Sequence, residues 1–243
     1  MKITVINGSP KGERSDTLKI TKAFLRGMGE NSANAHTMGI AEKSESSDIT
    51  DPIVIIDTMK VDVKPCLGCY CCWQKTPGMC VQKDDMKNIL DEISTSDLII
   101  WSSPLYCYSF PANCKAVLDR LLPLSSPKQY KDEKGNTHHP RRNEHRVQHM
   151  LISGCGFPDR EGNYDGLIFQ FQRMFGKDAT MILCPEAPMF SVPEAAVVTE
   201  PYLALVEKAG SEFKTGGKIT DETLAALSLL MIPADEYRRI ANG

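Results

Sequence analysis

The chain has 243 residues and carries 28 Lys and Arg against 31 Asp and Glu, a formal net charge of −3 at pH 7. This near balance argues against a nucleic-acid partner or an anionic membrane surface. The chain has no apolar run of membrane-spanning length and no basic-then-apolar signal pattern at its start, so we expect a cytoplasmic protein with one good-sized core. In such a protein, nine cysteines indicate metal, redox or buried-thiol roles rather than a disulfide framework.

The first segment predicts a buried strand, a hydroxyl-rich loop and a helix. Residues 3–6 are mostly β-branched and apolar, residues 7–10 (NGSP) break the strand, and Ser15 is a helix N-cap type. The loop would gather free backbone N–H groups at the positive end of a helix dipole, and Ser9, Ser15 and Thr17 add hydroxyls. Such a site suits a phosphate, although an ordinary βα turn fits this segment equally well.

Four more strands alternate with helices along the rest of the chain. Apolar runs predict these strands at residues 52–58, 97–101, 147–153 and 180–184. Helical spacing predicts helices from about 17, 84 and 111, at 164–175, and in the tail at 199–213 and 221–230. Residues 27–50 and 123–146 are polar and are expected to be surface segments. The alternation is typical of an α/β fold with a parallel sheet covered on both faces.

The loops that leave strands one, three and four should converge, because ligands of parallel sheets bind beyond the carboxyl ends of the strands. The chain lacks both a GxxxxGK[ST] loop and a GxGxxG fingerprint after the first strand, which excludes two common nucleotide sites. Tyr106, Tyr108 and Phe157 lie in two of these loops. Each one alone is more simply explained by packing, but together they favour a planar ligand beside a phosphate site.

Four stretches resemble flavodoxin-like NAD(P)H-dependent FMN reductases and, within them, an iron–sulfur-flavoprotein-like branch. The family's phosphate loop is similar to INGSPKGERSDT, and its second flavin loop is similar to SSPLYCYSFPANCKAVLDR. The branch's cysteine segment and third loop are similar to CLGCYCCWQKTPGMCVQKDD and ISGCGFPDRE. The resemblance covers about residues 1–190. It implies a flavodoxin-like three-layer sandwich whose five-stranded parallel sheet has the order 2-1-3-4-5. It also implies an FMN-binding domain at residues 1–198, with the cysteine-rich loop 60–83 inserted, and a C-terminal helical extension at 199–243.

The resemblance also assigns residues to the cofactor. Around the phosphate it places Ser9, Lys11, Ser15 and Thr17. Along the flavin ring it places Pro104, Leu105, Tyr106, Cys107 and Tyr108 from one loop, and Gly154, Cys155, Gly156 and Phe157 from another. No catalytic side chain is expected, because FMN itself carries out the hydride chemistry.

The function implied is an oxidoreductase that takes a hydride from NAD(P)H and passes electrons to a flavin, quinone, nitro compound or similar acceptor. The alternative is an electron-transfer protein reduced by a protein donor such as ferredoxin, and a flavin-dependent regulatory module is a third class, since fold does not fix function. The family implies a homodimer or homotetramer. Arg141 and Arg142, in the polar segment 123–146, form a further hypothesis as contacts for the phosphates of the nicotinamide donor.

The cysteine loop contains Cys66-x2-Cys69-x2-Cys72-x7-Cys80, a spacing that lets one loop wrap a single cluster. Thiolates favour Fe–S clusters or zinc, and the resembled branch holds a [4Fe-4S] cluster with this pattern. Structural or redox-active thiols near the flavin are an equal alternative, because Cys71 beside Cys72 makes it ambiguous which cysteines would be the ligands. Zinc is a minor alternative. The remaining cysteines, at positions 107, 114, 155 and 184, are expected to be small buried hydrophobes.

Overall fold

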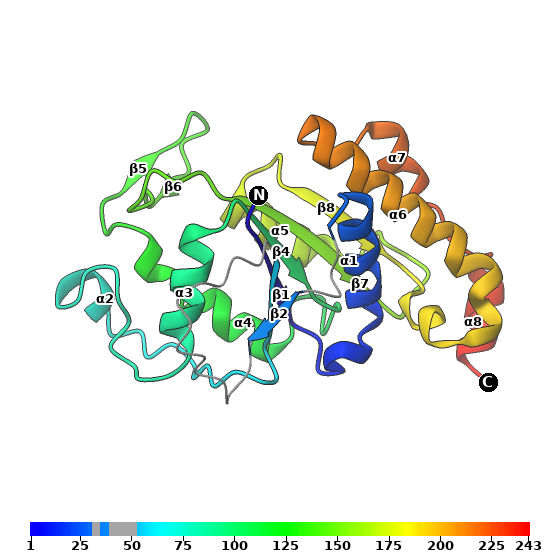
Figure 1. Cartoon of the computed structure of the whole chain (residues 1–243), viewed down its shortest axis with the longest axis horizontal. Helices are drawn as coiled ribbons and strands as arrows, with labels where there is room; N and C mark the ends of the chain where they lie inside the picture. Colours follow the sequence, from blue (N-terminus) through cyan, green and yellow to red (C-terminus); the bar gives the residue numbers. More distant parts are fainter. Residues whose placement is uncertain (31–34, 39–52) are drawn as a thin grey trace.

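The structure is a computed structural model that describes residues 1–30, 35–38 and 53–243. Its centre is a parallel sheet in the order β2-β3-β1-β4-β7-β8 (Figure 1). The strands are β1 (Ile3–Asn7), β2 (His36–Met38), β3 (Ile53–Asp57), β4 (Leu98–Ser102), β7 (Gln148–Gly154) and β8 (Thr180–Cys184). The predicted flavodoxin-like order 2-1-3-4-5 is confirmed, because it corresponds to β3-β1-β4-β7-β8.

The edge strand β2 corrects one expectation. Residues 27–50 were predicted to be a polar surface connection, yet His36–Met38 pairs with β3 and adds a sixth strand. Three residues are too few to show the alternation by which a strand is recognised in a sequence. Positions 31–34 and 39–50 of that segment lie outside the described residues.

Helices cover both faces of the sheet, which confirms the three-layer sandwich. Alternate strand residues face opposite sides, so Val5 belongs to one buried cluster and Ile6 to the other. The first face carries α1 (Asp16–Gly27) and α6 (Ala196–Gly216), and the second carries α3 (Met86–Thr95), α4 (Ala112–Asp119) and α5 (Asp165–Phe175). Short 3-10 turns lie at Gly12–Arg14, Leu122–Leu124, Ala187–Ser191 and Pro193–Ala195.

The helices α1 and α6 touch through their backbones. A Cβ atom added at Gly27 would collide with the carbonyl oxygen of Glu207, and one added at Gly210 would collide with that of Phe24. Two further helices, α7 (Asp221–Ala226) and α8 (Ala234–Ala241), follow α6 at the right of Figure 1. The predicted helix at 221–230 therefore ends early, and α8 was not predicted.

The cysteine segment lies at the opposite end of the molecule from α6–α8 (Figure 1). It contains the short helix α2 (Cys71–Gln74), next to a hairpin of β5 (Tyr130–Lys131) and β6 (Thr137–His138). The indole N–H of Trp73 donates to the carbonyl oxygens of Leu122 and Ser125, both at 3.0 Å. The ring of Trp73 also lies 4.7 Å, between ring centroids, from that of His139, which directly follows β6, so the cysteine segment packs against the hairpin.

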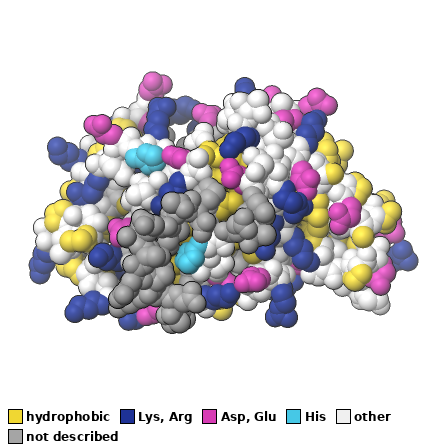
Figure 2. All heavy atoms as spheres, in the orientation of Figure 1, with side chains coloured by type: hydrophobic (Ala, Val, Ile, Leu, Met, Phe, Trp, Pro, Cys, Tyr) yellow, Lys and Arg dark blue, Asp and Glu magenta, His cyan; other side chains and the backbone are white. Residues whose placement is uncertain are grey.

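On the face seen in Figure 2, the Lys and Arg side chains outside the grey area lie both along the rim and across the face, interspersed with Asp and Glu. Among the described helices, none combines the length and apolar character that a membrane crossing requires.

Candidate functional site

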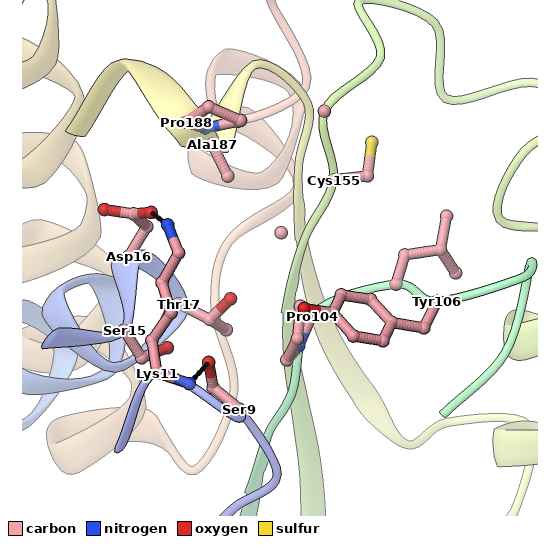
Figure 3. Close-up of a pocket in the computed structure, with 13 residues that line it drawn as sticks. Ser9, Lys11, Ser15, Asp16, Thr17, Pro104, Tyr106, Cys155, Ala187 and Pro188 are labelled. Atoms are coloured by element: carbon pink, nitrogen blue, oxygen red, sulfur yellow. Dashed lines mark hydrogen bonds and ion pairs between the residues drawn. The ribbon is translucent and has the colours of Figure 1, made fainter. Parts of the chain in front are cut away.

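A pocket of about 190 Å³ lies where the loops after β1, β4, β7 and β8 meet (Figure 3). Its lining is Ser9, Lys11, Ser15, Asp16, Thr17, Pro104, Leu105, Tyr106, Gly154, Cys155, Gly156, Ala187 and Pro188. The structure therefore brings together all the residues assigned to the cofactor except Cys107, Tyr108 and Phe157. Whether these residues hold FMN stays a prediction.

The first loop presents buried hydroxyls at the N-terminus of α1. Ser15 is the N-cap: its Oγ accepts a hydrogen bond from the Leu18 amide at 3.2 Å, which leaves the hydroxyl proton free to be donated elsewhere. Ser9 and Thr17 line the same wall and are almost completely buried. The amides of Asp16 and Thr17 lie in the first helical turn, where N–H groups have no intrahelical acceptor. These donors and the helix dipole favour an anion here.

Asp16 is a pocket residue that sequence reasoning missed. Its carboxylate accepts from the Lys11 ammonium at 2.8 Å, from the Ser191 hydroxyl at 2.6 Å and from the Lys19 ammonium at 3.4 Å. Figure 3 shows Lys11 and Asp16 joined beside the hydroxyls of the first loop. In the sequence, Asp16 belongs only to a segment of helix-capping residues. Its contact with Ser191 forms only when the chain folds, so the sequence alone does not show it. Asp16 therefore holds Lys11 at the pocket and does not leave a negative charge there.

The wall opposite the first loop is built around Gly154, at the end of β7. A Cβ atom at this position would lie 2.6 Å from the Cβ of Ala187 and 3.1 Å from the Oγ1 of Thr17. The amide of Ala187 donates to the Cys155 carbonyl at 2.9 Å. Ala187 and Pro188, which sequence reasoning also missed, follow the fifth predicted strand at the same edge of the sheet. That position was the signal that could have identified them.

Three assigned residues lie outside the pocket lining. Cys107 and Tyr108 have left-handed backbone conformations, with φ of 48° and 63°, in a tight turn closed by mutual hydrogen bonds between Tyr106 and Ser109. This turn directs the chain outwards, so Cys107 is exposed and the expectation that it is buried is wrong. Phe157 is also exposed. Tyr106 alone among the three predicted aromatics lines the pocket.

None of the cysteines at 66, 69, 71, 72 and 80 lines the pocket, so the alternative of thiols near the flavin gains no support within one chain. Burial, together with the neighbouring thiols of Cys80, Cys66 and Cys69, raises the pKa of Cys72. Hydrogen bonds from the amide and thiol of Cys71 lower the pKa of Cys69. Over residues 1–30, 35–38 and 53–243, no three Cys, His, Asp or Glu side chains are arranged to hold a metal ion. The [4Fe-4S] ligand set stays a prediction.

A buried ion pair closes the base of the cysteine loop. The guanidinium of Arg120 is paired with the carboxylate of Asp84, and both side chains are almost fully buried. The Arg120 guanidinium also donates to the Cys80 thiol at 3.3 Å and to the Lys64 carbonyl at 3.1 Å. Although burial would raise the pKa of Asp84, hydrogen bonds from Arg120 and from the amides of Lys64 and Met86 hold it below its usual value. We call Lys64, Asp84 and Arg120 the neck of the loop.

The two arginines considered for the nicotinamide donor make other contacts. The guanidinium of Arg141 lies 3.3 Å from the ring of His149, and Arg142 donates to the Pro123 carbonyl at 3.1 Å. Neither lines the pocket.

Comparison with known proteins gives consistent matches. The model of the family "NADPH-dependent FMN reductase" matches residues 1–135. An iron-sulfur flavoprotein from Methanocaldococcus jannaschii is 30% identical over 135 residues, which are 56% of this chain and 59% of that protein. An FMN-dependent NAD(P)H:quinone oxidoreductase from Pseudomonas aeruginosa is 25% identical over 123 residues, 51% of this chain and 54% of the relative. The matches thus span about half the length of these curated relatives.

Some solved structures share the fold of this chain over most of its length, although their sequences differ from it. An FMN-dependent NADH-azoreductase from Bacillus anthracis, in complex with FMN, superposes with a TM-score of 0.58 at 16% identity and covers 88% of this chain and 100% of its own. An NAD(P)H:quinone oxidoreductase from Methanothermobacter marburgensis gives a TM-score of 0.57 at 15% identity, covering 88% and 97%. At these identities the likeness concerns the fold alone.

Proposed function

Because the chain belongs to the NADPH-dependent FMN reductase family, we propose that it binds FMN in this pocket and transfers a hydride from NAD(P)H through it to an acceptor. The family is one of flavin-dependent oxidoreductases. One observation carries the proposal. The same pocket contains buried hydroxyls at the α1 N-terminus and a wall at Gly154, where there is no room for a side chain.

The chemistry of the first loop fits a phosphate. Ser9, Ser15 and Thr17 offer hydroxyl donors, and the first turn of α1 offers amides. Asp16 would repel an anion if it stood alone, but the ammonium groups of Lys11 and Lys19 more than balance its charge. This end of the pocket therefore suits a phosphate monoester.

The other end of the pocket suits a planar ring. Its lining there includes Pro104, Leu105, Tyr106, Gly156 and Pro188, which are apolar or aromatic or have no side chain. Once bound, FMN supplies the hydride chemistry, and the residues named here bind and orient it. Burial raises the pKa of the one thiol in the lining, that of Cys155, so this thiol stays protonated at neutral pH.

A second candidate function is electron transfer, with FMN and an iron–sulfur cluster as a relay. It is favoured by the relatives described as iron-sulfur flavoproteins and by the spacing Cys66-x2-Cys69-x2-Cys72-x7-Cys80 in this chain. In both functions the acceptor lies outside the chain. By the family analogy we propose a homo-oligomer.

The test begins with anaerobic purification, an absorption spectrum, and assays for FMN, iron and sulfide. We expect a flavin spectrum, or stoichiometric FMN uptake in a titration, and bleaching by NADH or NADPH. If the flavin is bleached only by a reduced ferredoxin-like protein, and the protein contains iron near four per FMN, the electron carrier is favoured. Protein that neither contains nor takes up FMN would contradict both functions.

Two matched variants locate the phosphate. Thr17→Val and Thr21→Val each remove a buried hydroxyl from α1, but only Thr17 lines the pocket. We expect Thr17→Val to raise the FMN Kd about tenfold or more, because a hydrogen bond to a charged group is lost. The Kd of Thr21→Val should change by less than about twofold. Equal effects of the two variants would place the phosphate elsewhere.

A further inference from the structure

One wall of the pocket is lined by residues 154–156 and continues outside the pocket through residues 157–160. All of these residues lie beyond the family match, which ends at residue 135. This wall takes its support from the C-terminal part of the chain. The phenol of Tyr237, in α8, donates to the Gly156 carbonyl at 3.1 Å. The guanidinium of Arg238 donates to the carboxylate of Asp159 at 2.9 and 3.1 Å, and Arg160 donates to the hydroxyl of Ser228. Three points of the wall are therefore tied to residues 228–238.

The bond at Gly156 differs from the other two because it reaches a residue that lines the pocket. Gly156 is exposed and has no side chain to anchor it, and even an added Cβ would approach nothing closer than Pro188 Cγ, at 3.7 Å. Among the described residues, the phenol of Tyr237 is the group that donates a hydrogen bond to the Gly156 carbonyl. Because a peptide unit is planar, holding this carbonyl also fixes the orientation of the Phe157 amide.

The adjoining wall is supported from the same side. Glu186 is completely buried and adopts a left-handed conformation with φ of 58°. Its amide donates to the Phe157 carbonyl at 3.0 Å, and its carboxylate accepts from the Met231 amide at 2.7 Å. A non-glycine residue keeps such a backbone conformation only where its surroundings impose it. Ala187 follows directly in the pocket lining, so the C-terminal segment supports two neighbouring walls.

We propose that Tyr237 is a positioning residue of the flavin pocket, holding the Gly156 peptide in the orientation against which the cofactor packs. Tyr237 itself does not line the pocket and acts through Gly156. The inference rests on the proposed FMN site. It assigns a role in cofactor binding to a part of the chain that the family match does not reach.

The chain provides a matched control for the test. Tyr202, in α6, is as buried as Tyr237, and its phenol also donates to a carbonyl, that of Leu227, at 3.3 Å. The acceptor of this hydrogen bond, Leu227, lies outside residues 154–160. Tyr237→Phe and Tyr202→Phe thus each remove one phenol hydroxyl that donates to a backbone carbonyl, and thermal unfolding of both variants checks that each is folded.

The first readout is the FMN Kd of the whole chain, measured by flavin fluorescence. We expect Tyr237→Phe to raise it roughly 3- to 10-fold, the range for one lost hydrogen bond, and to shift the visible flavin absorption maximum. Tyr202→Phe should change the Kd by less than about twofold. An unchanged Kd in Tyr237→Phe, or an equal increase in the control, would overturn the proposal.

The second readout needs no flavin. Cys155 adjoins Gly156, is only 5% exposed, and its thiol contacts the Phe157 carbonyl at 3.5 Å. In flavin-free protein, iodoacetamide should label Cys155 several-fold faster in Tyr237→Phe than in wild type or Tyr202→Phe, as followed by mass spectrometry. If wild-type protein bound no FMN, the proposed function would fail, and this labelling alone would decide whether Tyr237 holds the wall. Equal labelling in all three proteins would overturn that role.

Discussion

Two glycines in one pocket wall have different reasons to lack a side chain. Gly154 sits where three loops meet, so a Cβ would come within 2.6 Å of Ala187 Cβ, whereas the same atom at Gly156 would make an ordinary contact at 3.7 Å. Real Cβ atoms do not approach as closely as 2.6 Å, so Gly154→Ala must push the loop after β8 away from Thr17.

We therefore expect Gly154→Ala to weaken FMN binding at least tenfold and Gly156→Ala to weaken it no more than about threefold. Fluorescence titration of both variants measures this difference. If both variants bound FMN like wild type, the convergence at Gly154 would not belong to the cofactor site.

Glu186 makes the stability of the fold depend on pH. Burial raises the pKa of its carboxyl group, despite the hydrogen bonds that it accepts from the amides of Met231 and Ile232. Between the ordinary pKa of a glutamate and this raised value, the folded chain keeps a proton that the unfolded chain releases. The contribution of Glu186 is therefore fully present below about pH 4 and is lost as the pH rises through the folded-state pKa.

Glu186→Gln cannot titrate and should not lose this contribution. We expect the Tm of the variant to increase relative to that of wild type between pH 4 and pH 8, as measured by differential scanning calorimetry in matched buffers. A Tm difference that stayed constant over this range would show that Glu186 does not titrate there.

At the scale of elements, the crossing of α1 and α6 depends on glycine. Gly210→Ala adds a methyl group against the backbone of α1, and overpacking of this kind typically costs about 1–3 kcal/mol. Alanine has the higher helix propensity, by up to about 1 kcal/mol, so propensity alone would predict stabilisation.

We expect Gly210→Ala to lower the free energy of unfolding, as measured by urea denaturation. Gly216→Ala, at the end of the same helix with no atom within 4 Å of its added Cβ, should leave it unchanged or raise it. If Gly210→Ala were as stable as Gly216→Ala, the two helices would have room to separate.

The elements that the sequence predicted well are those whose signal is local. The five long strands and the helix after Ser15 show their periodicity or capping residue within a few positions. The strand β2 has only three residues, and α8 has only eight with one buried side chain, Tyr237, so the apolar signal of each is brief. The same distinction holds in the pocket. Its hydroxyl loop was predicted because it is contiguous, while the role of Asp16 depends on Ser191, 175 residues away.

At the scale of the whole molecule, the C-terminal half completes the core and the pocket. Tyr202, Val206 and Phe213 of α6 belong to the same buried cluster as Val5 and Phe24. The predicted boundary after residue 198 stays a prediction. The contacts of α6 with α1 nevertheless mean that residues 1–198 alone would expose one face of their own core. The hydroxyl loop at the α1 N-terminus, where we propose the FMN phosphate, therefore depends on a helix that begins 180 residues after α1 begins (196 − 16).

The neck of the cysteine loop has a consequence for how such proteins can diverge. Lys64, Asp84 and Arg120 fix the two ends of the segment independently of what lies between them. Insertions, deletions or cysteine changes within residues 66–79 would leave the register of β4 and α3 intact, because long surface loops are tolerated when their ends are held. The segment is thus held at its two ends and is free to vary between them. The length and the cysteine content of residues 66–79 can therefore change without disturbing the loops that line the pocket.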